Sequence, residues 1–378
     1  MQEKKLKVLL ATGVYPPDIG GPATYVKILE KELPKHGVDV KIVTYGDGSD
    51  NKNVTYISRK QNIILRYLRS FIIVWRLAKD CDVLYSFDLI SIGLSCALVK
   101  ILKPKLKFIV RLGGDRQWEN AVEKGGYKNT LRQYYIDKNF SLKEKMFYAL
   151  SDFVLSLADK VIFNAEILKD IYVNQRRLNK EKTQVIKNIL PSININNYIK
   201  KERSYNVVLF IGRIIKVRNI KRLIEAFEII KKENSRCVLE IVGDGPEKNN
   251  IIEYVNDRKL NNKIIIKDGV NREDVLNKIF NSDVVVLPSI TEINANTVIE
   301  ALMLGVNVVI TKESEPFFIN FSDQKIKYIN PLEVNDIASH IIKSILENKT
   351  DKRLNEIEKI ACAKEKIVYE HLQIFRKK

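Results

Sequence analysis

The stretch VVLFIGRIIKVRNIKRLIEAF, residues 207–227, holds both kinds of element that decide the fold of this chain. It opens with five apolar residues, mostly β-branched, and this run ends at Gly212 and Arg213, as a buried strand would. Its second part repeats apolar residues every three or four positions, which predicts an amphipathic helix. A strand followed directly by a helix is the repeating unit of a parallel α/β sheet.

The same alternation runs along nearly all of the 378 residues. Before a polar connector at 191–206, strands are predicted at 7–12, 38–46, 82–87, 107–114 and 160–165, and helices at 22–37 and 60–79. After it, strands are predicted at 207–213, 237–245, 263–269, 283–289 and 306–311. We therefore expect two Rossmann-like, doubly wound parallel-sheet domains facing across a cleft. Their bounds are predicted as 1–195 and 205–350, with a C-terminal helix of about 352–378 packing back on the first domain.

The composition is that of a globular protein, with 45% hydrophobic and 29% charged residues. The four cysteines are scattered without a CxxC pair, which favours reduced thiols in a cytoplasmic protein over a zinc site or disulfide framework. No run reaches the roughly 18 apolar residues that a membrane span needs. We expect neither a metal nor a cofactor.

The formal net charge of +18 is concentrated in the first half of the chain. Residues 1–190 carry 33 Lys and Arg against 20 Asp and Glu, a balance of +13, and the remainder carries 31 against 26, a balance of +5. Such a field favours anionic partners such as phosphates or an acidic lipid surface, and nucleic acid is the less favoured partner. General lysine richness of the chain is the alternative explanation.

The predicted helix at 59–80 combines Arg66, Arg69 and Arg76 with several large apolar residues. A basic amphipathic helix of this kind can lie on an anionic bilayer, at the inner face of the membrane. It can equally pack its apolar face on a core while its arginines reach solvent. The sequence leaves these two interpretations open.

The stretch PSITEINANTVIEALMLG, residues 288–305, places two glutamates eight positions apart after an apolar strand. Glu292 follows the strand directly and is expected to project into the cleft. Asn296 can cap a helix that starts at Thr297, and the free N–H groups of that helix end suit a diphosphate. Glu300, about one turn into the helix, is placed to accept hydrogen bonds from a pair of ribose hydroxyls.

The stretch GRIIKVRN, residues 212–219, puts Arg213 and Arg218 just past a strand. Two cations aimed at a departing nucleoside diphosphate stabilise its developing charge and can replace a metal. Lys216 is a nearby rival for the second cation. A solvated basic loop is the structural alternative.

Two glycine-rich turns complete the candidate site. IVGDGPE, residues 241–247, holds Gly243 and Gly245 at a strand end, and DIGGPA, residues 18–23, holds Gly20 and Gly21 just before a helix. Bare amides at a helix start can approach a phosphate or a sugar. Turns that merely connect a strand to a helix would need the same glycines.

In this order, these motifs resemble those of retaining glycosyltransferases of family 4, which have the GT-B architecture and a Glu-x7-Glu motif. The resemblance implies that Glu292 contacts the donor sugar, Glu300 the ribose, and Arg213 and Arg218 the diphosphate. It implies a donor site that also includes Gly20, Gly21, Gly212, Lys216, Gly243, Asp244, Gly245, Asn296, Thr297 and Val298.

The chain departs from the family pattern in three places. Arg218 and Asn219 stand where the family usually has Lys followed by Gly, so the positive charge is kept although its geometry shifts. Bulkier residues at 293–296 replace the usual glycine-rich turn, which alters the predicted sugar pocket. VRLGGDRQWE, residues 110–119, has Gly113 where many members carry a histidine. Asp115 is the candidate contact for acceptor or sugar there, or else a turn residue. A retaining mechanism in which the departing phosphate takes the acceptor proton needs no histidine.

The resemblance predicts transfer of a sugar from a UDP- or GDP-linked donor, without a metal, to a glycan, a lipid-linked molecule or another acceptor. Such an activity would serve the synthesis of a cell-surface polysaccharide or glycoconjugate. Two alternatives remain at this level. One is a GT-B-shaped binding or scaffold protein without activity, and the other is a nucleotide-sugar epimerase that needs no acceptor.

Overall fold

The computed structural model describes residues 5–18, 21–188, 193, 198–293, 296–314, 325–347 and 364–377. The chain divides into two compact units. The first unit comprises Met1–Gln117, Lys138–Ile189 and Cys362–Lys378, and the second comprises Trp118–Asp137 and Leu190–Ala361. The C-terminal helix thus belongs to the first unit.

Residues 118–137 lie within the predicted bounds of the first domain, 1–195, but in the structure they cluster with the second unit. The carboxylate of Glu123 accepts hydrogen bonds from the backbone amides of Lys216 and Val217, at 3.2 and 3.0 Å. The amide of Leu131 donates to the hydroxyl of Thr291 at 3.0 Å. These long-range contacts leave no trace in the local pattern of the sequence.

The first unit is built on a seven-stranded parallel sheet with the order β3-β2-β1-β4-β5-β6-β7. Its strands are β1 (Leu6–Thr12), β2 (Val38–Tyr45), β3 (Val54–Ile57), β4 (Val83–Ser86), β5 (Lys107–Leu112), β6 (Lys160–Phe163) and β7 (Thr183–Val185). The apolar runs are buried because parallel strands are covered by helices on both faces.

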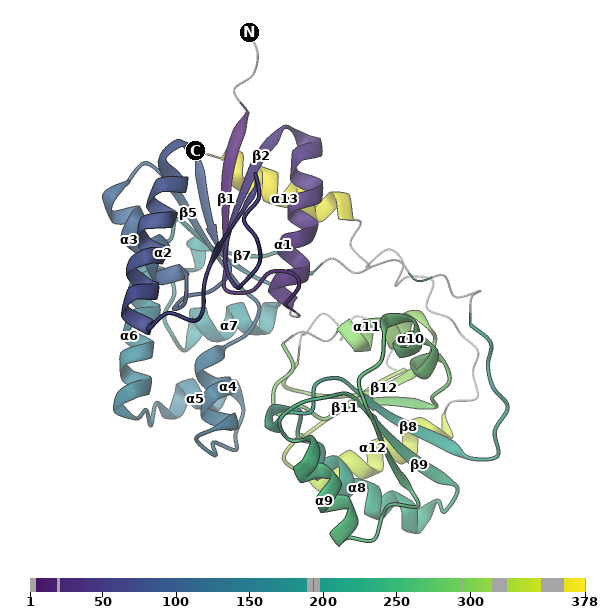
Figure 1. Cartoon of the computed structure of the whole chain (residues 1–378). Helices are drawn as coiled ribbons and strands as arrows, with labels where there is room; N and C mark the ends of the chain where they lie inside the picture. The colour runs from purple at the N-terminus through teal and green to yellow at the C-terminus, as the bar shows by residue number, and fades with distance from the viewer. Residues whose placement is uncertain are drawn as a thin grey trace. The chain divides into compact units, whose positions relative to one another are not determined.

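Helices cover both faces of this sheet, with α1 and α13 on one side and α2, α3 and α6 on the other (Figure 1). The helical elements are α1 (Gly21–Glu32), η1 (Leu33–His36), α2 (Ile63–Leu77), η2 (Ala78–Asp80), α3 (Gly93–Leu102), α6 (Leu142–Leu157), α7 (Glu166–Asn174), η3 (Lys180–Lys182) and α13 (Lys364–Arg376). Val8 and Leu10 of β1 share one buried core with Leu29 of α1 and Leu372 of α13. The helix α4 (Arg116–Glu123) begins in the first unit and continues into the second.

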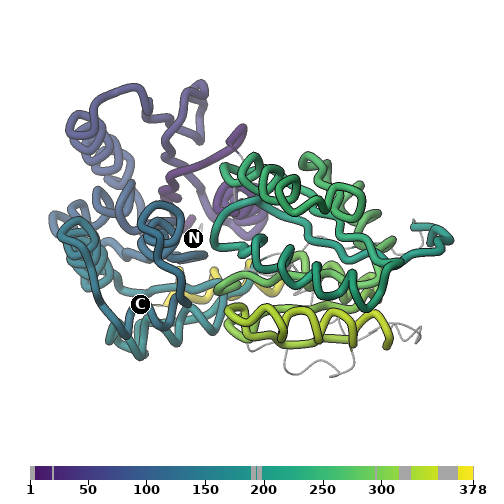
Figure 2. The backbone as a smooth tube through the Cα atoms, turned by 90° about the horizontal axis from the view of Figure 1, so that it is seen from below, coloured from purple at the N-terminus to yellow at the C-terminus, as the bar shows by residue number. Residues whose placement is uncertain are grey.

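The second unit is built on a six-stranded parallel sheet with the order β10-β9-β8-β11-β12-β13. Its strands are β8 (Asn206–Ile211), β9 (Cys237–Val242), β10 (Ile264–Lys267), β11 (Val284–Leu287), β12 (Asn307–Thr311) and β13 (Ile326–Ile329). Its helical elements are α5 (Leu131–Asp137), η5 (Lys216–Arg218), α8 (Ile220–Glu233), α9 (Lys248–Asp257), α10 (Arg272–Phe280), α11 (Asn296–Met303) and α12 (Val334–Leu346). Figure 2 shows α12, in yellow-green, running beside α8, with which it packs.

The predicted fold class of two Rossmann-like parallel-sheet domains is confirmed. In each sheet the strand order reverses next to its first strand, between β1 and β4 in one unit and between β8 and β11 in the other. Ligands of open α/β sheets bind outside the carboxyl ends of the strands at this switch point. The topology therefore points to the loops after β1 and β4 and to the loops after β8 and β11.

Candidate active site

Two loops of the second unit meet at the switch point of its sheet. One follows β8 and includes η5, and the other follows β11 and runs through residues 288–293. The amide of Ile290 donates a hydrogen bond to the carbonyl of Val217 at 2.9 Å. The buried side chain of Asn219 donates to the carbonyls of Pro288 and Pro331, at 3.0 and 2.6 Å. These bonds fix the loop that carries the candidate cations against the loop that carries Glu292.

Asn219 also has a left-handed backbone, with φ of 60°, and it is the residue at which η5 ends and α8 begins. Asparagine tolerates this conformation better than most residues with a side chain. The sequence therefore turns sharply between η5 and α8 without a glycine.

The predicted glycines allow two loops to touch. A Cβ on Gly243 would lie 1.9 Å from the carbonyl oxygen of Gly212, and one on Gly245 would lie 2.2 Å from that of Ile214. Gly212 and Gly243 also have φ of 153° and 151°, a region that side-chain-bearing residues rarely adopt. In this structure the glycines serve the close packing of the loops after β8 and β9.

The second predicted cation and the first predicted glutamate form an ion pair. A terminal nitrogen of Arg218 contacts Oε2 of Glu292 and also donates to the hydroxyl of Ser289 at 3.2 Å. Ser289 in turn donates to the same carboxylate oxygen at 2.8 Å. Glu292 is buried, whereas the Arg218 side chain is 25% exposed. The carboxylate thus fixes the orientation of the guanidinium.

Burial lowers the pKa of Arg218 to about 10, with Glu119 of α4 opposing this shift and the positive charge of Arg213 adding to it. The two arginines are therefore close enough to repel each other. Arg213 itself is exposed. The Nε of Arg218 has no acceptor among the described residues. An anion that bound between the two guanidinium groups would relieve their repulsion.

The helix α11 begins at Asn296, one residue earlier than predicted, so Asn296 is its first residue rather than a cap before Thr297. Val298 is buried in the core, so it offers a ligand only its backbone. Glu300 is buried and accepts a hydrogen bond from Arg272 of α10 at 2.8 Å. Burial raises the pKa of Glu300, and Arg272 opposes the shift.

Two further predicted residues of the second unit have protein partners. The ammonium of Lys216 donates to the backbone carbonyl of Glu123 at 2.6 Å. Asp244 accepts hydrogen bonds from Lys248 and from the amide of Gly269, each at 2.7 Å. Asp244 thus ties the loop after β9 to the loop after β10.

The remaining predicted site residues lie in the first unit. Gly21 begins α1, where a Cβ would meet nothing within 4 Å, and Gly20 lies outside the described residues. Asp115 is buried and accepts a hydrogen bond from the hydroxyl of Tyr172 at 2.8 Å. In the parts of the chain that the structure describes, no group of three or more His, Cys, Asp or Glu could hold a metal ion.

The sequence alone did not single out Ser289, Asn219 or Arg272 as parts of the site. Ser289 stands inside the quoted motif, three residues before Glu292, a spacing that lets a loop hydroxyl reach the carboxylate. Asn219 carried a weak signal as a turn-forming residue before a helix. Arg272 carried none, because its partner Glu300 is 28 residues away.

Family models match both halves of the chain. The family described as Glycosyltransferase Family 4 matches residues 19–190, and the family described as Glycosyl transferases group 1 matches residues 194–360. Together these matches span nearly the whole chain. The protein is a GT-B glycosyltransferase of the group 1 and family 4 type.

Individual relatives agree with this assignment. The alpha-monoglucosyldiacylglycerol synthase of Streptococcus pneumoniae is 23% identical over 387 residues, covering 93% of this chain and 82% of the relative. The sucrose-phosphate synthase from Thermosynechococcus elongatus superposes with a TM-score of 0.71, at 16% identity and 98% coverage of both chains. Anabaena HepE, solved with UDP, gives a TM-score of 0.70 at 17% identity, again with 98% coverage of both chains. HepE has also been solved with UDP-glucose.

Proposed function

We propose that this protein transfers a sugar, with retention of anomeric configuration and without a metal ion, from a nucleotide-diphosphate donor to a membrane-associated acceptor. The cluster of Arg213, Arg218, Ser289 and Glu292 at the switch point of the second sheet carries the proposal. It sets two guanidinium groups, one of them held by a buried carboxylate, where a parallel sheet binds ligands. The HepE structures in complex with UDP and with UDP-glucose support a UDP-linked donor.

The arginines would hold the diphosphate, and the opening amides of α11 would add donors to it. Glu300 would face the ribose, with Arg272 fixing its carboxylate. Glu292 would hold Arg218 in place and contact the sugar. These roles follow the order of the motifs along the chain and the contacts of each side chain.

Catalysis would consist of one group transfer. An acceptor hydroxyl oxygen bonds to the anomeric carbon as the bond from that carbon to the phosphate oxygen breaks. The acceptor proton passes to the departing phosphate, so no side chain has to act as the base. Arg213 and Arg218 stabilise the negative charge that develops on the leaving diphosphate.

The donor site is tested with R213Q and E292Q, against the matched control R236Q. Arg236 is exposed and lies just before β9, at the opposite end of the strands. We expect each site variant to lower nucleotide release by about 10²–10³-fold, and the control to keep the wild-type rate. Calorimetry with UDP and GDP separates binding from turnover. Wild-type rates in both site variants would refute the site, and a wild-type chain that binds neither nucleotide would favour a scaffold.

The acceptor side of the proposal rests on α2. Its outward residues Leu65, Leu68, Ile72 and Trp75 are 53, 56, 37 and 38% exposed, so this face does not pack on the core. The buried residues of α2 are Ser70 and Val74. The exposed side chains recur every three or four positions, as on a helix that lies in a bilayer interface.

Basic residues accompany this apolar face. Arg69 and Arg76 are exposed on the same helix, and the adjacent helix α3 adds the exposed Leu98, Ile101 and Leu102. This combination favours an anionic membrane surface. The name of the pneumococcal relative, alpha-monoglucosyldiacylglycerol synthase, supports a lipid acceptor. Across the described residues, no helix is both long and apolar enough to span a bilayer.

Flotation with vesicles tests the membrane surface. Phosphatidylglycerol vesicles should carry the wild-type protein, and the L68S/W75S variant should lose at least about tenfold in binding. The control I252S/I265S removes two exposed apolar side chains from the second unit. Equal losses in both double variants would contradict the proposed surface.

A further inference from the structure

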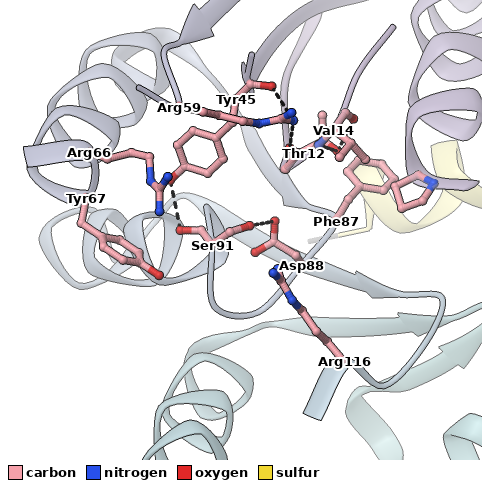
Figure 3. Close-up of a pocket in the computed structure, with 12 residues that line it drawn as sticks. Thr12, Val14, Tyr45, Arg59, Arg66, Tyr67, Phe87, Asp88, Ser91 and Arg116 are labelled. Carbon is pink, nitrogen blue, oxygen red and sulfur yellow. Dashed lines mark hydrogen bonds between the residues drawn. The ribbon is translucent and has the colours of Figure 1, made fainter. Parts of the chain in front are cut away.

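A second pocket lies at the switch point of the first sheet, with a volume of about 430 Å³. The ends of β1, β2 and β4 supply Thr12, Tyr45 and Phe87 to its wall, and α2 supplies Arg66 and Tyr67. Figure 3 shows these side chains around the cavity. The sequence marked Arg66 on the basic helix and the stretch that holds Arg116, but it did not indicate that they line one pocket, because the walls come from several separate segments.

Three arginines line the pocket, and they differ in their partners. Arg59 donates to Asp18 and to the carbonyls of Gly13 and Tyr45, so it is fixed in the wall. Neither Arg66 nor Arg116 is in an ion pair with any described residue of the chain. Arg66 lies 5.7 Å from the ring centre of Tyr45. The two remaining guanidinium groups are the cations that a ligand could meet.

Both arginines act on the same neighbour. Burial raises the pKa of Tyr67, Asp88 adds to the shift, and the charges of Arg66 and Arg116 oppose it. Arg66 and Arg116 line the pocket from different elements, α2 and the start of α4. The hydroxyl of Tyr67 donates to the carbonyl of Ile90 at 2.9 Å, which holds the ring in place.

Asp88, whose carboxylate lines the pocket, accepts hydrogen bonds from its own loop and from the start of α3. Asp88 accepts from the amides of Ile92 and Gly93, each at 3.1 Å, and from the hydroxyl of Ser91 at 2.5 Å. It therefore caps the start of α3, and burial raises its pKa. A Cβ on Gly93 would lie 2.1 Å from the carbonyl oxygen of Asp88, so the glycine permits this capping. Among the described residues Asp88 forms no ion pair with Arg66 or Arg116, although the charge of Arg116 lowers the pKa of Asp88 against the effect of burial.

We propose that this pocket binds a phosphoryl group of the acceptor, with Arg66 and Arg116 as its anion ligands. The inference rests on the proposed glycosyl transfer and adds to it a chemical class of acceptor. Guanidinium groups that approach from two elements suit the several oxygens of a phosphate.

The source of the phosphate can be a lipid head group or a soluble phosphate ester. Arg66 stands on α2 between Leu65 and Leu68, which belong to the exposed apolar face. A phosphate in the pocket would therefore lie next to a surface on which acyl chains can rest. This arrangement accommodates the lipid form, and the experiment below compares both forms.

Binding is measured by calorimetry on the full chain with two probes, glycerol 3-phosphate and monomeric dihexanoyl phosphatidate, and with glycerol as the neutral control. UDP is kept at saturation, and the titrations are repeated in an R213Q background, so that phosphate near Arg213 does not contribute. The variants are R66Q and R116Q. The matched control is R177Q, which removes an exposed arginine of the same unit outside the pocket.

We expect both phosphates to bind, glycerol not to bind, and R66Q or R116Q to weaken phosphate binding at least about tenfold. R177Q should bind as the wild type does. If the phosphatidate binds more tightly than glycerol 3-phosphate and L68S removes this difference, the ligand is the lipid form. Equal binding of both probes would identify the soluble form. Absence of saturable phosphate binding, or equal losses in R177Q and R66Q, would overturn the inference.

UDP binding by the same proteins separates the two proposals. Wild-type UDP affinity in R66Q and R116Q, together with lost phosphate binding, would support the pocket as a site of its own. Failure of the wild-type chain to bind UDP or GDP would count against the proposed transfer while leaving the phosphate titrations interpretable. Normal UDP binding with no effect of R66Q or R116Q on phosphate would refute the inference alone.

Discussion

His371 makes the stability of the docked C-terminal helix depend on pH. It is fully buried on α13, and its Nδ1 donates to the carbonyl of Ile367 at 2.8 Å. Its Nε2 lies 3.1 Å from the hydroxyl of Tyr85 and 3.4 Å from that of Tyr25. Burial, with the nearby charge of Arg111, lowers the pKa of His371 from 6.5 to about 3.

The sign follows from the depressed pKa. When α13 undocks, His371 regains its ordinary pKa and binds a proton below pH 6.5, whereas the docked helix stays neutral down to about pH 3. The docked state therefore has its full stability above pH 6.5 and loses it as the pH falls. Below pH 6.5, each pH unit lowers the free energy of undocking by about 1.4 kcal/mol. Between pH 7.5 and 5.0 the docked helix therefore loses about 2 kcal/mol, almost all of it below pH 6.5.

Hydrogen exchange of the amides of α13, corrected for intrinsic rates, measures this opening free energy at both pH values. The variant H371Q keeps a polar side chain but cannot titrate, so it should lose much less than the wild type. Burial raises the pKa of Glu370, so this residue stabilises the docked helix as the pH falls and opposes the effect of His371. Both proteins contain Glu370, so its contribution cancels when H371Q is compared with the wild type. Equal losses in the two proteins would refute the reasoning.

Two further predictions concern the loops of the candidate donor site. G243A should lower the free energy of unfolding by roughly 3 kcal/mol or more, because its Cβ would meet the carbonyl of Gly212. The control G126A, at φ of 71° with open space around it, should cost only about 1 kcal/mol, and similar losses in urea titrations would contradict the clash. N219A should cost about 2–4 kcal/mol, because it leaves two buried carbonyls without donors. N219G keeps the left-handed turn, so it should regain little of the stability that N219A loses, as measured by thermal denaturation. Full recovery in N219G would mean that backbone strain, and not the lost hydrogen bonds, causes the loss.

The sequence by itself determined the fold class. The strands at 7–12 and 207–213 are long apolar runs followed by helical periodicity, and such local patterns are sufficient for buried central strands. It missed β3, β7 and β13, which lie at the edges of their sheets. These three edge strands are short and only partly buried, so they lack a continuous apolar run. The edge strand β10 (Ile264–Lys267) was predicted because it begins with three consecutive isoleucines.

The sequence also singled out Arg218, Glu292 and Glu300 as candidates, because each stands in a recognisable motif just past a strand. Only the tertiary structure decided their partners. The pairing of Arg218 with Glu292 spans 74 residues, and that of Glu300 with Arg272 spans 28. No local pattern encodes which charges meet when two strand ends are brought together.

The helix α2 shows the same difference between what the sequence determines and what the tertiary structure decides. Its apolar and basic residues were evident from the sequence, but whether the apolar face was buried depended on what covers it. The structure leaves Leu68 and Trp75 exposed and places Arg66 in the lining of the pocket, to which another element contributes Arg116. Periodicity determines that a helix has two faces, whereas burial is set by neighbours that only the folded chain brings into place.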